Sequence, residues 1–344
     1  MKITIIKAAL IVATISAITG CSSLDDERES NIQSLITFTP MEIQAITRGT
    51  QTTKNAITSY GVTSSIYSVG SSYTSAKCGS YWLNEEIEAA SGNSGHYWPG
   101  GEYRVSFFTY APYGSPLSIR SSNDLGYPVY QYSVPSAISN QIDFITADII
   151  DHSGEGITDP IPLTFTHQCT DIRFNVYNQG TESLTVHSIA ICGVKYSGTC
   201  AGGVWTLNDA VNSTSVNPFL LTLGTSIAGG ATVDVTGTNN HFIMLPQIVP
   251  SGTNIFDIDA TIAGVRKHYY HTLTSNLNLQ KSKTYTFKLT LGESGIIVDM
   301  ETDIQDWVVE TKYLSIGSIG SGSTWTQTSV QDAEDFGISN WEEE

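Results

Sequence analysis

The sequence has little positive charge and few charged residues of any kind. Lys and Arg number 16 against 33 Asp and Glu, charged residues make up 14% of the 344 residues, and the formal net charge is −17. Such an acidic chain repels phosphate backbones, which argues against nucleic acid as a partner. Long runs of Leu, Ala, Glu and Lys are also missing, whereas Gly and Tyr are frequent. This composition is typical of an exported β protein.

Motifs of common enzymes and cofactor sites are missing as well. No H-E-x-x-H, G-x-S-x-G, Walker loop, G-x-G-x-x-G or EF-hand spacing occurs, so the sequence predicts no enzyme, no cofactor and no metal. His268 and His271 are three apart in an expected strand, which sends their side chains to opposite faces. Asp151, Glu155 and Asp159 offer oxygen ligands for Ca²⁺, but a solvated acidic loop is the preferred interpretation because their spacing fits no ligand pattern.

No apolar run reaches the length of a membrane-spanning helix, but a short one begins the chain. Lys2 and Lys7 precede 13 uncharged residues, whereas a spanning helix needs about 20. Small residues then lead to Cys21, so residues 1–20 are expected to be a cleaved lipoprotein signal peptide. Acylation of Cys21, palmitate included, would anchor the protein, because several acyl chains hold a protein stably at a membrane. An ordinary secretory signal with an incidental cysteine is the alternative.

Cysteines are few, and none forms a C-x-x-C pair. Beyond Cys21 the chain has Cys78, Cys169, Cys192 and Cys200. An exported protein lies in a compartment that permits disulfides. Cys192 and Cys200 flank a Gly-containing turn, so a disulfide between them is one interpretation. Buried free thiols are the other, and the sequence leaves both open.

Strand patterns begin after an acidic tether over residues 21–34. In the first, Leu35 to Ile46, Ile36 and Phe38 alternate with threonines, which predicts a half-buried strand. Pro40 lacks a backbone N–H, so we expect this strand to lie at a sheet edge or to bend there.

Further short strand patterns recur along the whole chain, separated by turn residues. The clearest is 284–291, where Tyr285 and Phe287 alternate with Thr284 and Thr286. The sequence therefore predicts an all-β protein of two tandem antiparallel β-sandwich domains, transthyretin-like or Greek-key in type. The expected domains are residues 35–159 and 160–312, followed by a flexible acidic C-terminal extension at 313–344.

Short motifs spread over nearly the whole mature chain resemble one family in their order. They are the segment ending at Cys21, Arg48-Gly49, Ser59-Tyr60-Gly61-Val62, Tyr97-Trp98-Pro99-Gly100-Gly101, Ser106-Phe107-Phe108-Thr109-Tyr110-Ala111-Pro112, Pro162-Leu163-Thr164-Phe165-Thr166-His167, Leu245-Pro246-Gln247 and Lys283-Thr284-Tyr285-Thr286-Phe287. Each is an ordinary strand or turn pattern. Their order resembles the fimbrillin-like proteins, subunits of protease-processed (type V) pili on gut and oral anaerobes.

The resemblance implies a structural subunit, as shaft, anchor or tip, of a cell-surface fimbrium that supports adhesion. It implies a lipoprotein exposed on the cell outer membrane, cut between Arg48 and Gly49 by an arginine-specific protease. The cut would release the strand from Leu35 to Ile46, and a strand from another subunit would replace it by donor-strand exchange. The implied partners are other pilus subunits, in a homo- or heteropolymer, and the outer membrane through the lipid.

The C-terminal tail is the expected donor segment. Residues 317–323 are rich in Gly and Ser, and Trp325, Phe336 and Trp341 supply large apolar side chains for an acceptor groove. A disordered acidic tail is the alternative. The alternative for the whole protein is a stand-alone surface lipoprotein that binds a glycan or a host protein without polymerising.

Overall fold

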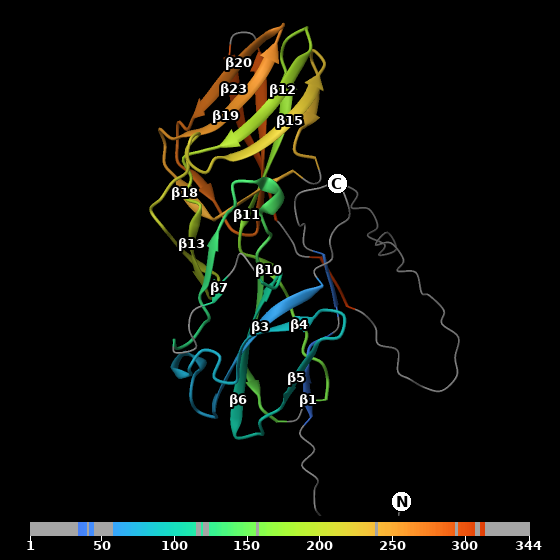
Figure 1. The fold of residues 1–344 in the computed structure, drawn as a ribbon, viewed down its shortest axis with the longest axis vertical. Coiled ribbons are helices and arrows are strands. Elements are labelled where there is room, and N and C mark those ends of the chain that lie inside the picture. Colours follow the sequence, from blue (N-terminus) through green and yellow to red (C-terminus); the bar gives the residue numbers. More distant parts are fainter. Residues whose placement is uncertain are drawn as a thin grey trace, which may run out of the picture.

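The computed structural model describes residues 34–39, 41–44, 58–114, 118–119, 124–155, 158–237, 240–292, 295–306 and 310–313. Over these residues the chain forms 24 strands and two single-turn 3-10 helices, η1 (Tyr73–Ser75) and η2 (Ile138–Asn140). None of the helices in this described part is long and apolar enough to cross a membrane. Figure 1 shows two lobes stacked along one axis, which we call the N-terminal and C-terminal lobes. The all-β prediction is therefore confirmed.

One layer of the N-terminal lobe is a five-stranded antiparallel sheet of order β10-β9-β6-β3-β4. Its strands are β3 (Ser59–Ser68), β4 (Trp82–Glu88), β6 (Tyr103–Ala111), β9 (Ile145–Ser153) and β10 (Thr166–His167). The other layer is thinner and contains the pair of β1 (Leu35–Thr37) and β5 (Asn93–Tyr97). Between the layers lies an apolar core that includes Trp98, Phe107 and Phe165.

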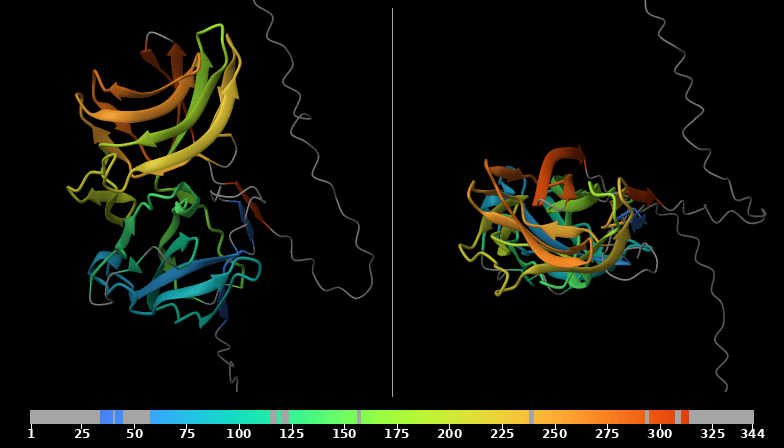
Figure 2. Two further views of the ribbon diagram at one scale, coloured as in Figure 1. Left: turned by 45° about the horizontal axis from the view of Figure 1, so that its top comes forward. Right: turned by 90° about the horizontal axis from the view of Figure 1, so that it is seen from above.

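The C-terminal lobe is a sandwich of a five-stranded and a four-stranded sheet. One has the order β16-β11-β22-β23, with β17 also paired to β11, and the other has the order β15-β12-β19-β20. The strands are β11 (Thr170–Asn178), β12 (Leu184–Ile191), β15 (Phe219–Ile227), β16 (Thr232–Asp234), β17 (Phe242–Met244), β19 (Asn254–Ile262), β20 (Val265–Thr272), β22 (Lys283–Gly292) and β23 (Gly295–Asp306). Figure 2 shows the twist of the sheets and, from above, the lobes superimposed.

Alternation along the strands builds the core of the C-terminal lobe as predicted. Ile172, Phe174 and Val176 of β11 are fully buried, and so are Phe287 and Leu289 of β22. Side chains of a strand alternate between its faces, so the polar residues between them face away from this core. One pair departs from the antiparallel expectation, because β11 and β22 run parallel. A long crossover joins them, so no hairpin sets their relative direction.

A third sheet, of order β14-β13-β8-β7, joins the two halves of the chain. Its strands are β7 (Ser118–Ile119), β8 (Tyr130–Ser133), β13 (Ser197–Ala201) and β14 (Val204–Leu207). β8 precedes the expected boundary near residue 160, yet its tyrosines pack in the core of the C-terminal lobe. Conversely, Ile161, Leu163 and Phe165 pack in the core of the N-terminal lobe. The N-terminal core therefore extends to Phe165, while β8, earlier in the chain, belongs to the core of the C-terminal lobe.

Two small pairs complete the fold. β18 (Gln247–Val249) pairs with β21 (Leu277–Leu279), and β2 (Met41–Gln44) pairs with β24 (Glu310–Tyr313). The second pair joins the two ends of the described chain beside the junction of the lobes (Figure 1).

Candidate functional site

The first strand of the chain lies between two backbone segments that are far apart in the sequence. On one side β1 runs antiparallel to β5, and the Phe38 N–H donates to the Gly92 carbonyl oxygen at 2.8 Å. On the other side the chain at Ile161 runs parallel to it. There the Thr39 N–H donates to the Ile161 oxygen, and the Ile161 N–H donates to the Thr37 oxygen, both at 2.8 Å. We call the space that residues 34–39 fill the first-strand groove.

Of the two alternatives predicted from Pro40, an edge position or a bend, the edge position does not hold for residues 34–39, because they have partners on both sides. Pro40 itself lies outside the described residues. The Trp98 N–H also donates to the Ser34 oxygen at 3.0 Å, and the Ser94 hydroxyl donates to the Ile36 oxygen at 2.6 Å. Backbone groups of an open groove lack such partners and are a template for another strand. Removing β1 would therefore expose hydrogen-bonding groups on both walls at once.

Two side chains of the segment 34–39 belong to the core of the N-terminal lobe. Ile36 and Phe38 are fully buried, which confirms the alternation read from the sequence. The Phe38 ring meets Phe107 edge to face, with centroids 5.4 Å apart, and Tyr60 in the same way at 6.1 Å. Truncating a buried Phe to Ala costs about 3–5 kcal/mol. The six-residue segment 34–39 thus carries a large share of the stability of its lobe.

Gly92 shows how closely the groove wall approaches the strand. A Cβ atom placed on Gly92 would lie 2.0 Å from the Phe38 carbonyl oxygen, and the residue has φ +63°. No other residue fits both the left-handed backbone and this contact. The sequence did not predict that Gly92 and Ile161 form the walls of this groove, because nothing in their local pattern indicates that a distant strand passes beside them.

The C-terminal strand of the described chain pairs with the segment that follows β1. β24 runs antiparallel to β2, with Met41 opposite Tyr313 and Gln44 opposite Glu310. The expected cleavage position, Arg48-Gly49, follows β2 by four residues and lies outside the described residues. Cys21 and the expected donor segment of a shaft subunit, residues 315–344, also lie outside them.

The four cysteines in the described part of the chain are buried, Cys78, Cys169, Cys192 and Cys200, and Cys192 and Cys200 are free thiols. The structure thus has no disulfide between Cys192 and Cys200. Cys192 follows β12 in the C-terminal sandwich, whereas Cys200 lies within β13, opposite Tyr130 and Trp205. The two cysteines belong to different sheets, so the turn between them does not bring their side chains together.

The remaining residues considered for metal binding have other partners. His268 approaches Asp257 at 3.2 Å, whereas the ring of His271 stacks on Phe256 with centroids 6.1 Å apart. Asp151 lies within β9, not in a loop, and accepts a hydrogen bond from Tyr67. Across the described ranges no group of three His, Cys, Asp or Glu residues is arranged to hold a metal ion.

The pattern of the fimbrillin-like family matches residues 43–307. The chain belongs to this family, whose proteins form cell-surface fimbria. No curated protein matches the sequence.

Solved structures share the fold at low sequence identity. A fimbrial protein from Bacteroides vulgatus is 16% identical with a TM-score of 0.55, over 72% of this chain and 93% of the other. A candidate cell adhesion protein from Bacteroides ovatus is 15% identical with a TM-score of 0.50, over 81% of this chain and 98% of the other. At these identities the likeness concerns the fold.

Proposed function

We propose that the protein is a fimbrial subunit that assembles by donor-strand exchange. Proteolysis after Arg48 would free β1 and β2 together with the lipidated Cys21, and a strand from another subunit would enter the first-strand groove. The observation that supports this most is the position of β1, which is paired on both sides and buries Ile36 and Phe38. Main-chain hydrogen bonds would give the incoming strand its affinity. Its alternate side chains would fill the two core positions that Ile36 and Phe38 occupy in the precursor.

This proposal makes the protein non-enzymatic, with other subunits as its principal partners. Acylation of Cys21 would hold the precursor on the outer membrane, exposed at the cell surface, until cleavage. A Cys21→Ser precursor is expected in the soluble fraction, because one missing acylation site removes every lipid chain. Retention of this variant in the membrane fraction would argue against the lipid anchor.

The test uses the full-length precursor and an arginine-specific protease. Cleavage after Arg48 should yield polymers that appear as ladders on unheated gels, whereas an Arg48→Ala precursor should stay monomeric. Arg28→Ala is the matched control, because Arg28 precedes β1. A cut after Arg28 would leave β1 in the groove, so blocking that cut should not prevent the formation of polymers. A precursor that is cut after Arg48 and never oligomerises, even with its partner subunits, would overturn strand exchange.

The donor segment has its own test. A chain lacking residues 324–344 should fold and be cleaved, but it should not form homopolymers, because it offers no strand to the next groove. Polymers of undiminished length would show that the donor lies elsewhere.

One observation favours a second candidate. β24 pairs with β2 of its own chain, as expected of a tip subunit or of a stand-alone surface lipoprotein that binds a glycan or host protein. In that case cleavage at Arg48 would leave a monomer that still accepts a synthetic strand but donates none.

A further inference from the structure

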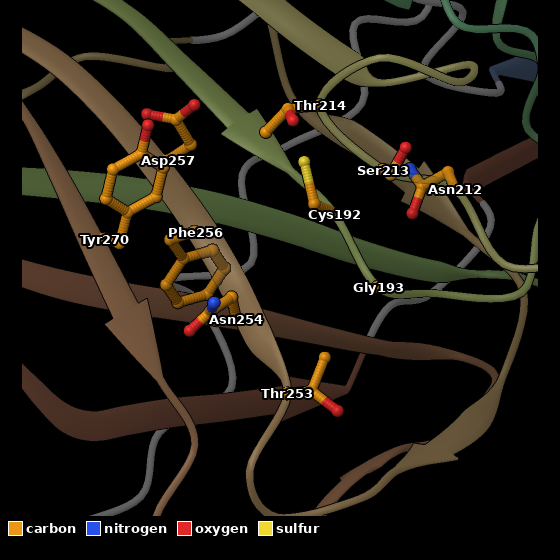
Figure 3. Close-up of a pocket in the computed structure, with 10 residues that line it drawn as sticks. All are labelled: Cys192, Gly193, Asn212, Ser213, Thr214, Thr253, Asn254, Phe256, Asp257 and Tyr270. Atoms are coloured by element: carbon orange, nitrogen blue, oxygen red, sulfur yellow. The ribbon is translucent and has the colours of Figure 1, made fainter.

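A pocket of about 350 Å³ opens on the C-terminal lobe and shares no residue with the first-strand groove. Its walls come from the end of β12, the loop between β14 and β15, the first half of β19 and the end of β20. Figure 3 shows Phe256, Asp257 and Tyr270 on the left, Thr214 above Cys192 in the middle, and Ser213 and Asn212 on the right. No Lys or Arg is among the ten residues that line it.

An aromatic ring forms an exposed platform at this pocket. Tyr270 is 56% exposed although it lies within a strand. It stands directly opposite Asp257 in the antiparallel register of β20 and β19. The ring of His268 stacks beside it, with centroids 6.4 Å apart. An exposed ring with a fixed neighbour offers an apolar face to a ligand at little cost in side-chain entropy.

Polar groups with spare hydrogen-bonding capacity surround this platform. The Asp257 side chain is only 16% exposed, and within the described structure its carboxylate has His268 as its one hydrogen-bond partner. A carboxylate of this kind accepts strong hydrogen bonds from hydroxyl groups. The Asn254 Oδ1 accepts a bond from Thr272, which leaves the Asn254 amide N–H groups to donate outward. The Thr214 hydroxyl adds a group that both donates and accepts.

These groups exclude several ligand classes. An anion would meet the Asp257 carboxylate in a protein of net charge −17 with no basic residue at the pocket. Burial, helped by the charge of Asp257, raises the pKa of the Cys192 thiol to about 11, so the thiol stays protonated at neutral pH and is a poor nucleophile. An organic cation would use only the ring and the carboxylate. Such a cation would leave the Asn254 amide and the Thr214 hydroxyl without a hydrogen-bonding role.

We propose that this pocket binds a neutral sugar. The apolar face of a pyranose ring would lie on Tyr270, one hydroxyl would donate to Asp257, and a neighbouring hydroxyl would accept from Asn254. A neutral sugar is the ligand class that uses the ring, the carboxylate, the amide and the Thr214 hydroxyl together.

The test is saturation-transfer NMR on the full-length protein with the methyl glycosides of glucose, galactose, mannose and fucose. At least one of them should receive saturation at millimolar concentration. In Asp257→Asn and in Tyr270→Ala its affinity should fall by about tenfold or more, since a hydrogen bond to a charged group contributes about 1.5–3 kcal/mol. The methyl glycoside of glucuronic acid should bind more weakly than that of glucose, because its carboxylate faces Asp257.

Matched controls separate this site from general stickiness. Tyr97, on the other lobe, is 53% exposed, so Tyr97→Ala removes an equivalent ring, and Asp209→Asn removes an exposed carboxylate; neither should change the signal. The proposal fails if no glycoside receives saturation. It also fails if Asp257→Asn and Tyr270→Ala bind the glycoside as tightly as the wild type does. Finally, it fails if choline binds at Asp257 while the glycoside binds at a different site.

Discussion

The two lobes close their sandwiches in different ways. The C-terminal lobe packs a five-stranded sheet on a four-stranded one, and in the five-stranded sheet the central strands β11 and β22 pair over eight residues. The N-terminal lobe packs a five-stranded sheet against a thin layer completed by the three residues of β1. The N-terminal lobe therefore depends on one short strand near the start of the described chain to complete its second layer. In the C-terminal lobe each of the two sheets has at least four strands.

The largest expected effect is the loss of both β1 side chains. Ile36→Ala with Phe38→Ala should destabilise the N-terminal lobe by about 5–10 kcal/mol, as much as the whole stability of a typical domain. Hydrogen exchange should accelerate in β3 and β6 and stay slow in β11 and β22. A synthetic peptide of residues 34–44 should restore protection, because the groove holds its strand without covalent help. Unchanged exchange in β3 and β6 would contradict the division of the cores.

A narrower change attacks the groove wall alone. Gly92→Ala should push β1 out and destabilise the N-terminal lobe by several kcal/mol, because the new methyl group would lie 2.0 Å from the Phe38 oxygen. Gly95 is the matched control: it also has positive φ, at +73°, but nothing lies within 4 Å of its Cβ position. Denaturant unfolding of both variants should give a much larger loss for Gly92→Ala. Equal losses would mean that only backbone strain is at work.

A smaller effect should follow from the β2–β24 pair. Deleting residues 310–344 removes β24 and should speed cleavage after Arg48 several-fold, because proteases cut segments that open locally and β2 loses its partner. Deleting only 324–344 keeps β24 and should leave the rate of cleavage unchanged. The measurement is the initial rate with a limiting amount of protease. A rate that is the same in all three chains would show that β24 does not protect the site.

The smallest effect concerns an ion pair within the C-terminal lobe. The Arg266 guanidinium donates to the Asp259 carboxylate at 2.5 Å and lowers the pKa of Asp259 below its usual value. A lowered folded-state pKa gives stabilisation that is present above the unfolded pKa of about 4 and is lost as the pH falls through the folded value. Asp259→Asn should therefore flatten the acid limb of the unfolding curve of this lobe. Asp209→Asn, at an exposed site, should leave that limb unchanged, and identical acid limbs in all three proteins would contradict the role of the pair.

Local alternation was enough to predict the strands and their buried faces. Ile36 and Phe38 in β1 and Phe174 and Phe287 in the C-terminal core all follow the two-residue period of a strand. Leu163 and Phe165 face a core as predicted, although it is the core of the N-terminal lobe. These features depend on neighbours in the sequence, so the sequence alone carries them.

Pairing between distant segments could not be predicted in the same way. The parallel pair of β11 and β22, the entry of β8 into a sheet with β13, and the pair of β2 with β24 each join residues more than 60 positions apart. Their partners compete with many other strands of similar pattern. The same holds for the sites: Gly92 matters because Phe38 passes beside it, and Tyr270 because the register places it opposite Asp257.

The first-strand groove has a symmetry that affects how a fibre could grow. β1 runs antiparallel to β5 and parallel to the chain at Ile161, so the two walls run in opposite directions. A strand inserted the other way round would again meet one parallel and one antiparallel wall. The directions of the walls alone therefore do not distinguish head from tail, so the unequal pockets of Ile36 and Phe38 contribute to the choice. The polarity of a whole fibre would then depend on the difference in size between two neighbouring side chains.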